Sequence, residues 1–150
     1  MGNIIRSPLA ENLFRHLAEE AGLNGKYEVD SAGTGAWHKG ESPDARMRRT
    51  AARHGLVYDG EARQIRLSDF DKFDLVVAMD TENRRELQSR TRRPEQARKI
   101  RLLREFDPGS GPNASVPDPY YGGDDGFETT YRIVEAGVQG LLQALEGGRA

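Results

Sequence analysis

A continuous apolar run at residues 75–79 (LVVAM) restricts the fold of this chain more than any other feature. Unbroken apolar runs of this length are typical of a strand that is covered on both faces. Asp80 and Thr81 follow at once and predict the start of a polar helix over about residues 82–89. A covered strand that leads directly into a helix is typical of sheets with parallel strands.

The same alternation of helices and strands extends along the rest of the chain. Ser7-Pro8 predicts the start of a first helix, and its apolar residues recur at helical spacing until Gly22 ends it. The other predicted elements are a strand at residues 27–32, a helix that follows Ser42-Pro43 and ends near Gly55, a helical turn at 68–70, a strand at 99–103, a long loop at 106–126 and an amphipathic last helix from Phe127 onward. We therefore predict one α/β domain over residues 1–150, built on a parallel sheet.

Composition excludes several classes of protein. Lys and Arg number 22 against 24 Asp and Glu, and this near-balance argues against a general nucleic-acid binder. The absence of cysteine excludes disulfides, thiolate metal sites and thiol nucleophiles within these 150 residues. Because the chain shows neither a membrane-span-length apolar run nor a signal-peptide pattern, we expect a cytoplasmic protein without membrane partners.

The most informative stretch lies directly before the first predicted helix. Gly2 permits a tight turn and Asn3 tolerates left-handed geometry, so successive amide groups are able to converge on one anion. The positive end of the helix dipole adds to this attraction, and a bound dianion would offset the positive charge of Arg6 there. An ordinary capped helix with a solvated arginine explains this stretch equally well.

Several motifs together resemble the low-molecular-weight protein tyrosine phosphatases. The signature of that family is a cysteine, five residues, an arginine, and then serine or threonine. The segments that carry the resemblance are residues 1–11 (MGNIIRSPLAE), 30–34 (DSAGT) with Trp37, 62–65 (ARQI), 78–80 (AMD) and 116–122 (VPDPYYG). The resemblance implies a three-layer α/β/α fold with a twisted parallel sheet of about four strands.

The resemblance also implies a role for each matching residue. Arg6 would bind the phosphoryl group, and Asp118 would protonate the leaving group and then activate water. The implied phosphate-binding loop is Gly2, Asn3, Ile4, Ile5, Arg6 and Ser7, and the implied aromatic walls of the substrate site are Trp37, Tyr120 and Tyr121. The implied substrates are phosphotyrosine proteins or small aryl phosphates, and no metal or cofactor is implied.

The chain departs from the family pattern at three places. The nucleophilic cysteine is expected immediately before Met1 and is absent, together with the first central strand of the sheet. Ile5 replaces a second cysteine, and Gly60 replaces a histidine that braces the loop in relatives. We therefore expect the chain to begin inside the active-site loop. We also expect it to be poorly stable, or to fill the place of the missing strand by exchange in a homodimer or by rearrangement.

Two questions stay open at the level of sequence. The chain is either a phosphatase by descent or a non-catalytic domain that binds phosphate and other oxyanions. Such a domain would be a pseudophosphatase or a truncated product. An arsenate reductase-like activity is a weaker alternative, because it needs several cysteines. The basic stretch at residues 90–99 is either a docking surface for acidic or phosphorylated partners or a solvated charged face.

Overall fold

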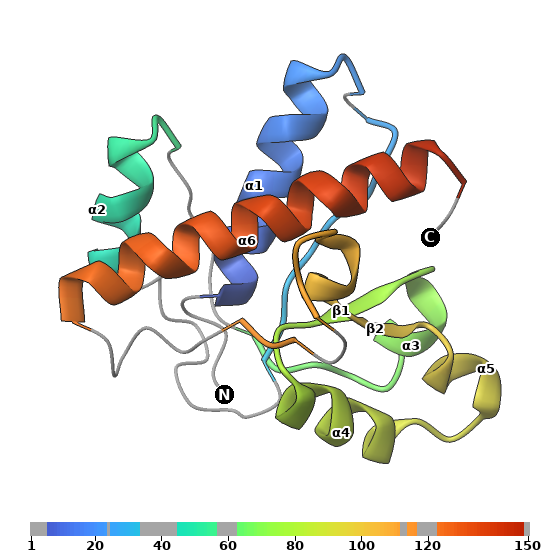
Figure 1. The fold of residues 1–150 in the computed structure, drawn as a ribbon. Helices are drawn as coiled ribbons and strands as arrows, with labels where there is room; N and C mark the ends of the chain where they lie inside the picture. The colour runs from blue at the N-terminus through green and yellow to red at the C-terminus, as the bar shows by residue number, and fades with distance from the viewer. Residues whose placement is uncertain are drawn as a thin grey trace.

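The computed structural model describes residues 6–23, 25–33, 45–56, 63–111, 114–116 and 123–148, without the side chains of Ser7 and of residues 123–125. The elements in chain order are α1 (Arg6–Glu20), α2 (Ala45–Arg53), α3 (Asp69–Lys72), β1 (Val76–Ala78), α4 (Thr81–Arg90), α5 (Pro94–Ala97), β2 (Ile100–Leu102), the 3-10 helix η1 (Leu103–Phe106) and α6 (Gly123–Glu146). Figure 1 shows α6 running across the molecule against α1 and α2, while α4 lies on the far side of the two strands.

The sheet contains β1 and β2, which pair in parallel. Val76 aligns with Ile100 and Ala78 with Leu102, so the strands predicted at 75–79 and 99–103 are confirmed. Outside these strands, one parallel bridge joins Gly33 to Gln64. In the described part of the chain the sheet therefore has two strands and a single bridge, where the family resemblance implied about four strands.

The prediction of a strand at residues 27–32 is wrong. Residues 27–32 carry no regular secondary structure, although Tyr27 and Val29 pack against the core and Glu28 is exposed. This alternation is what a strand requires on its faces. An extended segment becomes a strand only when its backbone bonds to a neighbour, and in the described residues the ladder begins only at Gly33.

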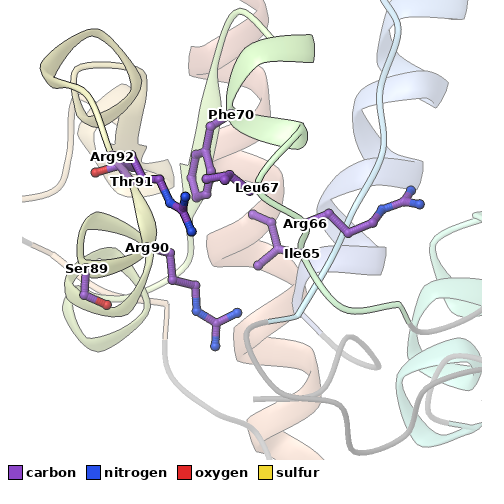
Figure 2. Close-up of a pocket in the computed structure, with 8 residues that line it drawn as sticks. All are labelled: Ile65, Arg66, Leu67, Phe70, Ser89, Arg90, Thr91 and Arg92. Atoms are coloured by element: carbon purple, nitrogen blue, oxygen red, sulfur yellow. The ribbon is translucent and has the colours of Figure 1, made fainter.

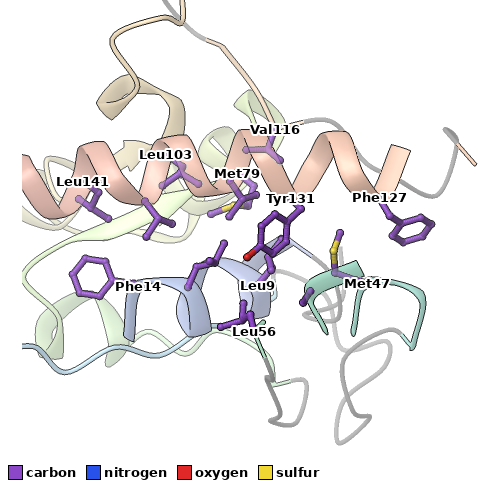
Figure 3. Close-up of a cluster of buried hydrophobic side chains, with 14 of the residues drawn as sticks. Leu9, Phe14, Met47, Leu56, Met79, Leu103, Val116, Phe127, Tyr131 and Leu141 are labelled. Atoms are coloured by element: carbon purple, nitrogen blue, oxygen red, sulfur yellow. The ribbon is translucent and has the colours of Figure 1, made fainter. Parts of the chain in front are cut away.

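Two apolar clusters show that the sheet lies between layers of helices. Successive side chains of a strand point to opposite faces. Val77 and Met79 belong to the larger cluster, formed mainly with α1, α2 and α6 (Figure 3), whereas Val76 and Ala78 belong to a smaller one beside Leu87 of α4. The predicted α/β class with helices on both faces of a small parallel sheet is thus confirmed.

The helices match the predicted pattern more closely at some ends than at others. α1 begins at Arg6, one residue before the predicted cap, and Gly22 follows its end with a φ of 75°. α6 begins at Gly123, so the last residues of the loop predicted at 106–126 belong to this helix. With 24 residues α6 is the longest helix described, and neither it nor any other described helix is long and apolar enough to cross a membrane.

Candidate active site

Arg6 lies at the first position of α1 and is buried, with 6% of its surface exposed. Its Nη1 donates to Asp80 Oδ2 at 2.7 Å and to the carbonyl oxygen of Val116 at 2.8 Å. Within the described ranges both bonds use this one nitrogen, and Nε and Nη2 form none. One edge of the guanidinium therefore holds the protein together, and the other edge has no partner in the described residues.

Asp80 holds this arrangement from the end of β1. Its Oδ1 accepts a hydrogen bond from the backbone amide of Asn83 at 2.6 Å, which caps α4 as the sequence predicted. Its Oδ2 accepts the bond from Arg6. A single carboxylate thus starts one helix and fixes the arginine at the start of another.

The segment at residues 114–116 completes the site from a third direction. The backbone amide of Val116 donates to the carbonyl oxygen of Met79 at 2.7 Å, and Ser115 Oγ accepts from the amide of Thr81 at 3.2 Å. The start of α1, the carboxyl end of β1 and this segment therefore meet at one point. Binding sites in parallel α/β folds usually lie at the carboxyl ends of the strands.

The positive charge of Arg6 has two hydrogen-bond acceptors within the protein. The first turn of α1 contains no acidic residue, and the positive end of a helix dipole disfavours a cation such as Arg6. We expected a bound dianion to offset that charge. The Asp80 carboxylate and the Val116 carbonyl accept hydrogen bonds from Nη1 and offset part of that charge, which keeps a buried arginine in place at a helix N-terminus; the bound dianion stays a prediction.

Most residues predicted for the site fall outside the described ranges. Arg6 lies where the start of α1, the residues after β1 and the segment at 114–116 meet, and Ser7 is described only as backbone in the first turn of α1. The predicted residues outside the described ranges are Gly2, Asn3, Ile4, Ile5, Trp37, Asp118, Tyr120 and Tyr121. Val116, two positions before Asp118, ties the start of the predicted acid loop to Arg6.

The sequence predicts Asp80 only as a helix cap, and its bond to Arg6 is found only in the structure. A usable signal was present, because a carboxylate directly after a covered parallel strand lies at the edge where such folds place their sites.

A second ion-pair cluster joins the segment before Gly33 to α3. Arg63 contacts Asp69 Oδ2 at 2.9 Å and Asp30 Oδ2 at 3.1 Å, and the amide of Arg66 donates to Asp69 Oδ2 at 2.8 Å. Burial opposes the charged form of Asp69, but these donors outweigh it and hold the pKa of its carboxyl below the ordinary value. The cluster fixes the backbone on either side of the Gly33–Gln64 bridge.

Comparison with known proteins identifies the family. The sequence model described as "Low molecular weight phosphotyrosine protein phosphatase" matches residues 1–149. A low molecular weight protein-tyrosine-phosphatase from Streptomyces coelicolor is 50% identical over 145 residues, which cover 96% of this chain and 88% of the relative.

Solved structures agree with the match in sequence. A protein tyrosine phosphatase from Entamoeba histolytica, crystallised with Hepes in its active site, superposes with a TM-score of 0.94 at 37% identity, covering 100% of this chain and 95% of that one. YfkJ from Bacillus subtilis superposes with a TM-score of 0.90 at 38% identity, covering 100% and 92%. The fold, the buried arginine at the start of α1 and the match along almost the whole sequence place this chain in the low molecular weight phosphotyrosine protein phosphatase family.

Proposed function

We propose that this chain binds the phosphoryl group of a phosphotyrosine or small aryl phosphate at residues 2–7, with Arg6 as the principal contact. The observation that carries the proposal is the buried guanidinium at the start of α1, which uses only Nη1 for contacts within the described residues. Nε and Nη2 form the planar edge that grips two phosphoryl oxygens. The unpaired amides and dipole of α1 add to the attraction for an anion.

Family membership supports a two-step displacement at phosphorus. A thiolate attacks phosphorus, the bond from phosphorus to the aryl oxygen breaks, and Asp118 gives its proton to that oxygen. Water then attacks phosphorus with Asp118 as the base, and the bond from sulfur to phosphorus breaks. Arg6 stabilises the charge on the equatorial oxygens in both steps.

The thiolate is the part of this scheme that the 150 residues do not supply, because they contain no cysteine. That observation favours a second function for the chain by itself, namely binding of phosphate and other oxyanions without turnover. Both functions use the same arginine, so phosphate binding tests what they share and turnover separates them.

Titration of the chain with inorganic phosphate, followed by calorimetry and by amide chemical shifts, tests the shared site. Arg6→Lys keeps the charge but removes the planar fork, and we expect it to weaken phosphate binding about tenfold or more. The control is Arg85→Lys on the exposed face of α4. Unchanged affinity in Arg6→Lys, or shift changes far from the first turn of α1, would remove Arg6 from the phosphate site.

Hydrolysis of p-nitrophenyl phosphate tests the chemical step. We expect background turnover from the 150-residue chain, and acid-optimum turnover after an apolar strand that ends in cysteine is added before Met1. Asp118→Asn in the extended chain is expected to abolish most of that turnover. Robust hydrolysis by the cysteine-free chain contradicts the thiolate route, whereas full activity of extended Asp118→Asn contradicts only the acid role.

A further inference from the structure

A cleft of about 420 Å³ lies between the segment that leads into α3 and the end of α4. The residues that line it are Ile65, Arg66, Leu67, Phe70, Ser89, Arg90, Thr91 and Arg92. Figure 2 shows Arg90 and Arg92 on one wall, opposite Ile65, Leu67 and Phe70, while the Arg66 side chain extends away from them. The cleft thus has a basic wall and an apolar wall, and the described residues that line it include no carboxylate.

The structure divides the basic stretch at residues 90–99 into two groups. Arg93 pairs with Asp71, Arg98 donates to the carbonyl oxygen of Pro94, and Lys99 Nζ donates to the carbonyl oxygen of Phe70 at 2.8 Å. These three cations have partners within the fold and do not line the cleft. The two that line the cleft, Arg90 and Arg92, are the ones that face an apolar surface.

Arg90 and Arg92 differ in how much of their charge is already offset. Arg90 Nη2 lies 3.0 Å from Glu86 Oε1, one turn earlier on α4, and a cation in the last turn also suits the helix dipole. Arg92 lies two residues beyond the end of α4 and is exposed. Its guanidinium has no hydrogen bond or ion pair with any described residue, so it is the stronger site for an incoming carboxylate.

One part of the apolar wall is packed into the core, and another part is exposed to solvent. Phe70 is 1% exposed and forms part of the smaller core cluster, on which Ile65 also packs. Leu67 is 40% exposed and is the one large hydrophobic side chain classed as exposed among the described residues. An exposed apolar side chain opposite an arginine offers an incoming peptide an apolar contact and a charge-assisted contact at the same place.

We infer that this cleft binds an acidic protein segment that carries one bulky apolar side chain. Carboxylates of the segment contact Arg92 and Arg90, and the apolar side chain lies against Leu67, Ile65 and Phe70. The site is distinct from the one around Arg6, because α4 begins beside Asp80 and reaches the cleft after 10 residues, a length of roughly 15 Å. The inference goes beyond phosphate chemistry and does not depend on turnover.

Fluorescence anisotropy with short unphosphorylated peptides tests this inference on the 150-residue chain. The first peptide places glutamates around a central leucine, the second replaces the leucine by serine, and the third replaces the glutamates by lysines. We expect only the first to bind well, and Arg92→Gln to weaken it about five- to tenfold through loss of a charge-assisted contact. Leu67→Ala is expected to weaken it about threefold or more through loss of apolar contact.

Arg85→Gln is the matched control, because it removes the same charge from an exposed position on α4. Amide shift changes on peptide addition should centre on residues 65–70 and 89–92. Equal weakening by Arg85→Gln, equal binding of the serine peptide, or shifts centred elsewhere would overturn the inference. Tighter binding of a single-stranded oligonucleotide that depends on Arg92 would also overturn it, because the occupant would then be a nucleic acid. Each readout is independent of Arg6, so loss of the phosphate site leaves the outcome unaffected.

Discussion

Arg6 joins three segments that are far apart in the sequence. It begins α1, and its Nη1 donates to the carboxylate of Asp80, two residues after β1, and to the carbonyl oxygen of Val116. A buried arginine is tolerated there because a charged and a neutral acceptor share its positive charge. The sequence predicted that Arg6 binds phosphate. The two acceptors that stabilise its buried charge lie 74 and 110 positions further along the chain.

Asp69 makes the stability of the protein depend on pH. Because its folded pKa lies below the ordinary value of 3.8, its stabilising effect is fully present above that value and is lost as the pH falls through the folded pKa. We expect Asp69→Asn to lower the urea midpoint at neutral pH and to flatten its decline below about pH 5. Unfolding in urea at a series of pH values measures this.

The control for that experiment is Asp74→Asn, at an exposed position near the end of α3. Some acid sensitivity will remain in Asp69→Asn, because donors also hold the pKa of Glu105 and Glu128 below the ordinary value against the effect of burial. An acid decline as steep in Asp69→Asn as in the unchanged chain would contradict the assignment.

α6 packs closely against η1 at two glycines, in addition to burying its apolar stripe. In the amphipathic helix predicted from Phe127 onward, Phe127, Tyr131, Val134 and Val138 recur at helical spacing and are all buried in the larger cluster. Gly140 and Gly137 were not predicted to matter. A Cβ at Gly140 would lie 1.7 Å from the carbonyl oxygen of Phe106, and one at Gly137 would lie 2.7 Å from Leu103 Cγ.

We therefore expect Gly140→Ala to destabilise the protein by about 1–3 kcal/mol, because the Phe106 backbone must shift to make room. Helix propensity alone predicts the opposite sign, a gain of roughly 1 kcal/mol. Urea unfolding distinguishes the two, with Gln139→Ala on the exposed face of α6 as the control. A more stable Gly140→Ala protein would show that η1 and α6 are not packed this tightly.

In the molecule as a whole, the sheet contributes less to the described core than the helices do. Its described strands have three residues each, and Val76 and Val77 of β1 are only half-buried. A strand that is covered on both faces should bury such residues completely. The helices, and α6 above all, therefore supply most of the described core.

In the described residues β1 and β2 pair only with each other, and so small a sheet favours pairing between molecules. We expect the chain to unfold at modest temperature and to form dimers as its concentration rises, by exchange or addition of strands. Sedimentation velocity over a wide concentration range, combined with thermal melts, measures both properties. A strictly monomeric chain with a cooperative melt at high temperature would contradict this prediction.

Local sequence patterns by themselves determined the longer helices, the two paired strands and the family that the chain resembles. The covered run at 75–79, the cap at Asp80 and the stripe from Phe127 act over a few residues, so their consequences are readable without a structure. Tertiary structure decided what depends on distant neighbours. Residues 27–32 have the alternation of a strand without a strand's ladder, Asp80 meets Arg6, and Arg92 faces Leu67 across a cleft. Backbone pairing, ion-pair partners and clefts are made between segments far apart along the chain, and no local pattern contains that information.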